Sequence, residues 1–235
     1  MAVYLLSDGR VAPVHRKVAA SSGVARAALE SLLEGPTTQD AADGLTSAVP
    51  SGTRLNGISV HGSVATVDLN GTFGSGGTSQ SESARLAQVT YTVTQFPGIS
   101  GVEFRMDGRT VTTFGSNGLT VDDPATRTSF EALTPAILVE TPTAGDSVIS
   151  PLHVSGSADV FEATFQLEVV DSSGQSLAAV TVHASSGTGT RGTFTATVPY
   201  GITAPEDGAL VAYDLSPKDG SRQDVVNIPL HLGAE

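Results

Sequence analysis

Short runs of alternating apolar and polar residues make up most of this chain, and turn-forming residues separate them. A period of two is typical of half-buried strands, whereas apolar positions three and four residues apart indicate an amphipathic helix. Up to residue 118, the pattern predicts strands over 3–6 and 11–18, a hairpin of 53–60 with 63–69, and a closing hairpin of 102–106 with 110–114. Pro13 makes the second strand an irregular or edge strand, because proline cannot donate to a ladder.

Two segments of this N-terminal part have helical spacing. Ser21 and Ser22 supply a cap for the first, and Gly35-Pro36 ends it. Its apolar face consists of Ala25, Ala28, Leu29, Leu32 and Leu33. We expect loops over 40–44 and 71–83.

The second helix is predicted from a capping box, Ser79 with Glu82, to a stop at Pro97-Gly98. Residues 89–94 are rich in β-branched side chains, which favour a strand, but the cap and the length favour a helix. The N-terminal part is therefore predicted to be an α/β sandwich, with small helices against a sheet.

The pattern changes after residue 118. Residues 119–136 show no sustained period and are predicted to be a linker, with a short helix near 124–133. Seven strands are predicted over 136–140, 152–158, 163–170, 177–183, 192–198, 208–216 and 224–232. Their regular spacing favours an immunoglobulin-like β-sandwich. Its expected core is Phe161, Phe165, Leu167, Val169, Phe194 and Val211.

These expectations give an α+β chain with three parts. Residues 1–118 form the α/β domain, 119–136 the linker and 137–235 the all-β sandwich. Cysteine is absent, which excludes disulfides, thiolate nucleophiles and cysteine-ligated zinc. The sandwich therefore has no cross-sheet disulfide, and without tryptophan it cannot be an antibody-type domain.

The net charge of −12 is unevenly distributed. Residues 1–118 hold eight Lys and Arg against nine Asp and Glu, whereas residues 119–235 hold four against fifteen. An acidic half repels phosphate backbones, so no nucleic-acid partner is expected. The simplest interpretation of this acidic half is a solvated surface. Its functional interpretation is a face for a basic partner or a divalent cation.

The candidate chemistry is sparse. His15, His61, His153, His183 and His231 are too far apart in sequence to predict a metal or catalytic cluster. The glycine-rich stretch 71–79 lacks the lysine of a phosphate-binding loop, and we expect no parallel βαβ unit there. It is interpreted as an exposed loop able to contact a partner.

Two further polar motifs have structural explanations. Asp123, after Asp122, precedes Pro124 and is expected to cap a helix. Residues 216–221 are expected to form a tight hairpin end in which Lys218 pairs with a carboxylate. We therefore predict no catalytic, cofactor-binding or metal-binding residue, no cofactor and no enzyme activity.

Six separated motifs carry a family resemblance. LLEGPT at 32–37, SAVPSGT at 47–53 and VDL at 67–69 resemble a GerMN domain, the sporulation and spore germination module. VFEA at 160–163, RGTF at 191–194 and SPKDGS at 216–221 resemble the immunoglobulin-like domain of bacterial spore germination. The resemblance implies a first domain similar in shape to ring-building modules.

The resemblance also implies a function. We expect a non-catalytic, exported cell-envelope binding or assembly module of lipoprotein type, located extracytoplasmically. Its partner would be an envelope protein or another copy. No apolar run reaches the roughly 18 residues that span a bilayer. We therefore expect membrane contact only through an export signal or lipid anchor upstream of this sequence.

The alternative is a carbohydrate- or peptidoglycan-binding module of the cell wall. Sugar sites commonly stack rings on exposed aromatic side chains, and this chain has only Tyr4, Tyr91, Tyr200 and Tyr213 besides phenylalanine. An exposed Tyr200 paired with Tyr213, or a conserved groove lined by polar residues, would favour the alternative. A flat apolar patch would favour protein assembly.

Overall fold

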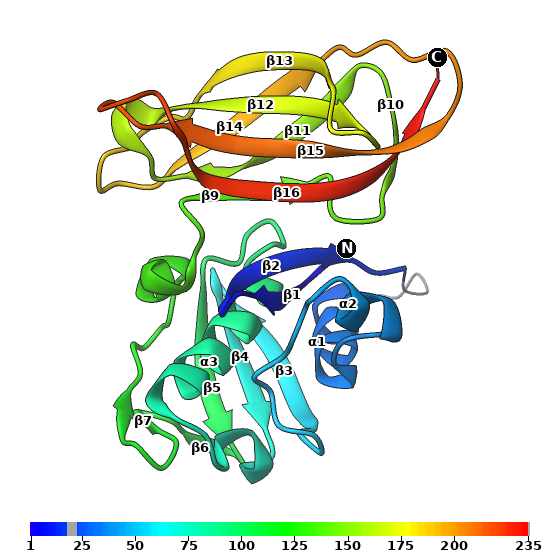
Figure 1. The fold of residues 1–235 in the computed structure, drawn as a ribbon. Coiled ribbons are helices and arrows are strands. Elements are labelled where there is room, and N and C mark those ends of the chain that lie inside the picture. Colours follow the sequence, from blue (N-terminus) through cyan, green and yellow to red (C-terminus); the bar gives the residue numbers. More distant parts are fainter. Residues whose placement is uncertain (18–22, 235) are drawn as a thin grey trace. The chain divides into compact units, whose positions relative to one another are not determined.

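A computed structural model describes residues 1–17 and 23–234 and divides the chain into two compact units, Met1–Thr134 and Pro135–Glu235 (Figure 1). The predicted cap at Ser21 and Ser22 lies outside the described residues. The boundary differs from the predicted linker over 119–136, because most of that segment belongs to the first unit. Val121, Ala125 and Phe130 are buried there, so the segment contributes apolar core.

The first unit contains a four-stranded sheet of order β3-β4-β5-β6 and two separate two-stranded sheets, β1-β2 and β7-β8. Its elements are β1 (Ala2–Ser7), β2 (Arg10–His15), α1 (Val24–Glu34), α2 (Thr38–Ala42), β3 (Leu55–His61), β4 (Val64–Leu69), η1 (Gly71–Gly74), α3 (Ser79–Val93), β5 (Gly101–Met106), β6 (Arg109–Thr110), β7 (Thr113–Phe114), β8 (Leu119–Thr120) and η2 (Arg127–Leu133). The predicted α/β arrangement is confirmed.

Helix α3 is buried on every side, unlike an ordinary surface helix, which has one polar face. Every residue from 84 to 93 is buried, including Gln88, Thr90 and Thr92. The helix packs against the β1-β2 hairpin, α1 and β5. Polar side chains on such a helix need partners inside the protein.

The outer edge of β1 supplies those partners. Ala2 donates its N–H to Gln95 Oε1 (2.8 Å) and accepts from Gln95 Nε2 (2.6 Å). Tyr4 donates its N–H to Thr92 Oγ1 (3.1 Å) and accepts from Gln88 Nε2 (3.0 Å). The side chains of Gln88 and Thr92 in α3, and of Gln95 just after it, replace a neighbouring strand for β1, and we call them the Gln88–Thr92–Gln95 ladder.

Pro13 fits this arrangement. It lies opposite Tyr4 in the β1-β2 register, where the N–H and C=O of Tyr4 point away from β2 toward α3. The N–H that Pro13 lacks would likewise have pointed away from its partner strand. The prediction of an edge strand over this segment is consistent with β2 pairing with β1 alone.

Three local predictions in the first unit are wrong. The segment predicted as a loop over 40–44 lies partly in α2, which Thr37 caps together with Asp40. Strands β4 and β5 flank α3 in the sequence and pair in parallel, so the glycine-rich stretch does lie in a βαβ unit, between β4 and α3. Asp123 caps no helix, because η2 begins later and Thr126 occupies its cap position.

The second unit is an all-β sandwich of a five-stranded sheet, β10-β16-β15-β12-β13, and a three-stranded sheet, β14-β11-β9. Its elements are β9 (Ile137–Thr141), β10 (Ser147–Ile149), β11 (Leu152–Ala158), η3 (Phe161–Ala163), β12 (Thr164–Asp171), β13 (Ser176–His183), β14 (Gly192–Val198), β15 (Glu206–Leu215) and β16 (Arg222–Gly233). All seven predicted strands are present. The sequence analysis missed β10, which has three residues and pairs in parallel with β16.

The predicted core of this unit is confirmed at Phe165, Leu167, Val169 and Phe194, which are all buried. It is wrong at the other two positions. Val211 faces outward beside Glu168, because Leu210 and Ala212 occupy the inward positions of β15. Phe161 lies before β12 in η3 and is 52% exposed.

The Gln88–Thr92–Gln95 ladder can be tested by replacing Thr92 with valine, which has the same shape but no hydroxyl. Thr92→Val leaves the buried N–H of Tyr4 without its acceptor. We expect the free energy of unfolding to fall by about 1–3 kcal/mol, measured by urea denaturation. Thr92→Ser keeps the hydroxyl and should lose clearly less; equal losses would contradict the role of the hydrogen bond.

Candidate functional site

The glycine-rich loop after β4 and the turn over 115–118 meet at the N-terminal end of α3. Arg85 of α3 holds the glycine-rich loop against the helix. Its guanidinium donates to the carbonyl oxygens of Phe73 (3.1 Å), Ser75 (3.0 Å) and Gly76 (2.7 Å), and its Nε donates to Ala48 (2.9 Å). Arg85 is itself 4% exposed, so a buried cation holds two segments by their backbones.

Glu82 holds the other loop. One carboxylate oxygen, Oε1, accepts from the Ser116 N–H (2.8 Å) and from Asn117 Nδ2 (2.9 Å). Oε2 is buried without a hydrogen-bond partner among the described residues. Burial acts to raise the pKa of Glu82, but the hydrogen bonds from Asn117 and Ser116 outweigh it and hold the pKa below its ordinary value. The carboxylate therefore stays charged near Arg85.

This arrangement corrects the predicted capping box. Thr78 and Ser81 form the box at the start of α3, one residue earlier than predicted. Glu82 is thereby released from capping. Its side chain turns to the 115–118 turn, which sequence reasoning did not connect with this helix.

Two glycines let the loops approach α3 this closely. A Cβ on Gly115 would lie 2.1 Å from the Glu82 carboxyl, and one on Gly77 would lie 2.5 Å from a guanidinium nitrogen of Arg85. Both glycines also have positive φ angles, of 71° and 101°, which favour glycine. Asn117 joins the two loops directly by donating to the Gly77 carbonyl (3.3 Å).

The result is an ordered, exposed surface that we call the loop cluster, residues 75–79 with 116–118. All eight of these residues are exposed. Hydroxyl, amide and backbone groups dominate it, while the charges of Arg85 and Glu82 lie beneath. Chemically, such a surface can form neutral hydrogen bonds with a partner.

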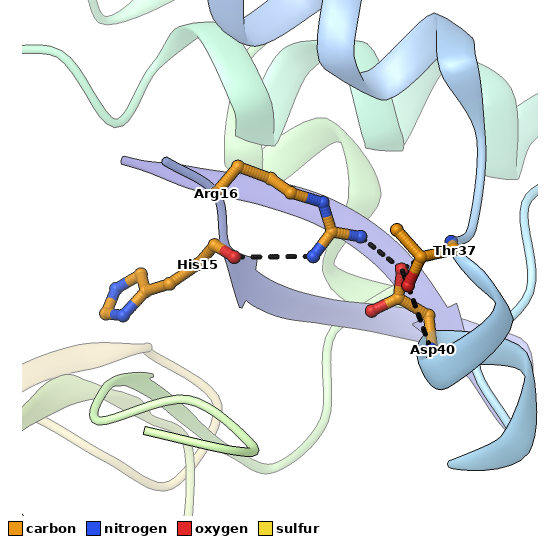
Figure 2. A network of polar contacts seen from close by, with 4 residues as sticks. All are labelled: His15, Arg16, Thr37 and Asp40. Carbon is orange, nitrogen blue, oxygen red and sulfur yellow. Dashed lines mark hydrogen bonds and ion pairs between the residues drawn. The ribbon is translucent and has the colours of Figure 1, made fainter. Parts of the chain in front are cut away.

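A second polar network fastens α2 to the end of β2 (Figure 2). The Asp40 carboxylate accepts from the Thr37 N–H (2.6 Å) and hydroxyl (2.7 Å) and pairs with Arg16. His15 contributes its carbonyl oxygen to Arg16 (3.3 Å), and its ring points away from Asp40. Burial acts to raise the pKa of Asp40, but the bonds from Thr37 and Arg16 prevail and lower it.

Comparison with known families decides which class of protein this geometry belongs to. The Germane model, described as sporulation and spore germination, matches residues 2–112. The Gmad2 model, described as the immunoglobulin-like domain of bacterial spore germination, matches residues 136–221. This chain is a GerMN–Gmad2 protein.

Two solved structures from Bacillus subtilis are similar to it. The first GerMN domain of the sporulation protein GerM is 25% identical, with a TM-score of 0.48, and the match covers 54% of this chain and 96% of that one. The tandem GerMN domains of GerM are 16% identical, with a TM-score of 0.49, and the match covers 100% of this chain and 60% of that one. A search of curated proteins found no match.

The three motifs of the GerMN domain make structural contacts, and one of them attaches to α3. Ala48, in the 47–53 motif, receives the Arg85 bond and donates its N–H to Gln88 (2.9 Å). Thr37, at the end of the 32–37 motif, caps α2. Asp68, in the 67–69 motif, accepts from the N–H of Gly108 (3.1 Å). These residues thus hold the fold together.

In the Gmad2 domain, residues 216–221 form the hairpin end that the sequence predicted. Ser216 and Ser221 pair through their backbones (2.9 Å), and Gly220 has a φ of 71°. Lys218, predicted to pair with a carboxylate, makes no ion pair within the described part of the chain.

The five histidines are not brought together. His15 and His61 end different strands of the GerMN domain. In the Gmad2 domain, His153 contacts Thr197 (3.3 Å), His183 contacts Thr164 (2.9 Å) and His231 contacts Asp207 (2.6 Å). Over residues 1–17 and 23–234, no three His, Asp or Glu side chains form a group that could hold a metal ion. No described helix is long and apolar enough to cross a bilayer.

All four tyrosines are buried. Tyr200 donates its hydroxyl to the carbonyls of Val148 (3.1 Å) and Gly233 (3.2 Å). The Arg222 guanidinium lies 4.0 Å from the centre of the Tyr213 ring. The exposed tyrosine pair that would have favoured sugar stacking is therefore not formed.

A shallow groove does lie on the three-stranded sheet of the Gmad2 domain. It has a volume of about 410 Å³, and its polar lining consists of Thr141, His153, Ser155, Thr195 and Thr197. A groove with a polar lining is one of the features expected of the alternative, a carbohydrate- or peptidoglycan-binding module.

The anchoring role of Arg85 predicts a large loss of stability on substitution. Arg85→Met leaves four backbone carbonyls without a donor and Glu82 without its nearby cation. We expect the free energy of unfolding to fall by about 3–5 kcal/mol, measured by urea denaturation. Arg26, in an exposed i,i+4 pair with Glu30, provides the control: Arg26→Met should change stability by less than about 0.5 kcal/mol.

The lowered pKa of Asp40 predicts a dependence of stability on pH. A carboxyl whose folded pKa lies below its unfolded value, about 3.9, stabilises the fold above that value and loses this contribution as pH falls through the folded pKa. Asp40→Asn should therefore unfold more easily than wild type at pH 7, by about 1–2 kcal/mol.

Urea midpoints measured from pH 7 down to about pH 2 should show the gap closing below roughly pH 4. Asp43→Asn is the matched control, because Asp43 is exposed and its carboxylate accepts one bond, from Gln39 (3.0 Å). A gap for Asp40→Asn that stays constant with pH would contradict the assignment.

Proposed function

We propose that this GerMN–Gmad2 protein is a non-catalytic binding or assembly module of the cell envelope, exported and held extracytoplasmically as a lipoprotein. Its partner is an envelope protein or a second copy of the chain. The family descriptions of sporulation and spore germination support the setting. The structure supports the binding role through one observation, the loop cluster.

The loop cluster supports binding because its shape is set before any partner arrives. Arg85 and Glu82 fix its two loops through five hydrogen bonds to residues 75, 76, 116 and 117. Exposed loops positioned by a rigid scaffold are frequent binding sites. A pre-organised surface also loses less conformational entropy on association.

The same bonds argue for a structural use of the buried charges. A catalytic acid, base or oxyanion donor must direct its polar atoms at a reacting group. Arg85 instead directs its Nε and both terminal nitrogens at backbone carbonyls. The strongest ionic groups of this region are thus engaged within the fold.

The test compares two Ser→Arg variants of the full chain. Ser79→Arg adds a long cation to the loop cluster, whereas Ser59→Arg adds the same group to the exposed strand β3. Light scattering over a concentration series should show wild type and Ser59→Arg rising to the same defined oligomer. Ser79→Arg should stay monomeric.

If wild type is monomeric, the partner version is tested by retention of an envelope-extract protein on the immobilised chain. Ser59→Arg should retain it and Ser79→Arg should not. The proposal fails if neither self-association nor retention depends on Ser79.

The polar groove of the Gmad2 domain supports a second candidate, a carbohydrate- or peptidoglycan-binding module. Its hydroxyl and imidazole groups can hydrogen-bond to sugar hydroxyls. Co-sedimentation with purified peptidoglycan should then be lost in Thr195→Arg, which fills the groove, and kept in Ser79→Arg. Sedimentation of neither wild type nor variants would remove this candidate.

A further inference from the structure

The connection from β11 to β12 presents an aromatic side chain to solvent. Phe161 is 52% exposed, whereas the other two phenylalanines of the Gmad2 domain, Phe165 and Phe194, are buried and pack edge to face. Exposing a large apolar ring has a free-energy cost in water. Phe161 is therefore a candidate contact residue.

Unfavourable backbone conformations shape this loop. Glu162, Ala163 and Thr188 have φ angles of 51°, 55° and 55°. Residues with a Cβ avoid this left-handed region and adopt it only where the surrounding structure holds them there. Such strain gathers at binding sites and active sites.

The facing loop, over 184–191, contains Thr188 and holds the backbone around Glu162 and Ala163. Thr188 donates its N–H to the Val160 carbonyl (3.0 Å), and Ala184 donates to the Ala163 carbonyl (2.9 Å). Glu162 donates its N–H to the Thr188 hydroxyl (3.1 Å). A Cβ on Gly187 would lie 2.5 Å from the Val160 oxygen. The two backbones are in contact, so the facing loop fixes the backbone that carries Phe161.

The net charge of the Gmad2 domain indicates what kind of partner the loop around Phe161 would bind. From residue 135 to the end, the chain has three Lys and Arg against twelve Asp and Glu, a net charge of −9. Glu162, directly after Phe161, is exposed. The Gmad2 domain of a second copy and an anionic membrane both carry negative charge, so they would be repelled. A basic protein surface would be attracted.

We infer that the Phe161 loop, residues 159–163 with 184–191, is the docking site for a basic partner protein, whose apolar pocket receives Phe161. The basic rim of that pocket faces Glu162. A buried aromatic anchor with complementary charge around it is a common plan for interface hot spots. This inference rests on the proposed binding function but uses none of the loop-cluster residues.

Peptides displayed on phage, with random sequences, serve as the probe against the immobilised full chain. We expect enriched peptides to combine Lys or Arg with Leu, Ile or aromatic residues. A synthetic copy of one should bind wild type measurably in fluorescence polarisation, more weakly at high salt. Phe161→Ser should weaken it at least tenfold.

Val225→Ser is the matched control, because Val225 is a 54% exposed apolar residue of the same domain. It should bind the peptide like wild type. Ala163→Gly tests whether the fixed backbone beside Phe161 contributes to binding. Glycine adopts the positive φ angle without strain, so thermal stability should not fall. The loop becomes more mobile, so it should bind the peptide several-fold more weakly.

Three results would overturn the inference: no enrichment of basic peptides, equal binding by Phe161→Ser and wild type, or loss of self-association in Phe161→Ser. The last would make a second copy the occupant. Because Phe161→Ser leaves the loop cluster intact and Ser79→Arg leaves the Phe161 loop intact, failure here is separable from failure of the proposed function.

Discussion

The GerMN domain depends on a helix whose buried side chains hydrogen-bond the backbone of other segments. Gln88 and Thr92 of α3, with Gln95 just after the helix, complete the free edge of β1. One turn earlier, Arg85 and Glu82 hold the loops at the start of the helix. An unpaired buried polar group destabilises the fold by more than one hydrogen bond stabilises it. A shift of α3 would leave several such groups unpaired, so these hydrogen bonds fix the position of the helix.

The elements of this fold could be predicted wherever a pattern is local. Alternation located the seven main strands of the Gmad2 domain, and the length of the segment before the stop at Pro97-Gly98 correctly favoured a helix, α3. Periodicity does not show which polar side chains are buried against another segment and which are exposed to solvent. Gln88 and Thr92 resemble a solvated face in sequence, and only the position of β1, more than eighty residues away, buries them.

The same limit explains what was missed in the candidate site. Glu82 fits a capping box on spacing alone, but Thr78 takes that role and the carboxylate binds a turn about 34 residues later. Its apolar character predicts Phe161 in the core, but it lies in η3 beside Glu162 and Ala163, which have positive φ angles, and it is largely exposed. Long-range pairing and backbone strain have no periodic signature, so they escape pattern analysis.

The ladder also has a consequence for the order of folding. The partners of Ala2 and Tyr4, Gln95 and Thr92, lie 93 and 88 residues further along the chain. Strand β1 is therefore made well before the residues that complete its edge, and closing so long a loop is slow. Until those partners are made, one edge of β1 stays open, and an open strand edge is able to pair with another chain.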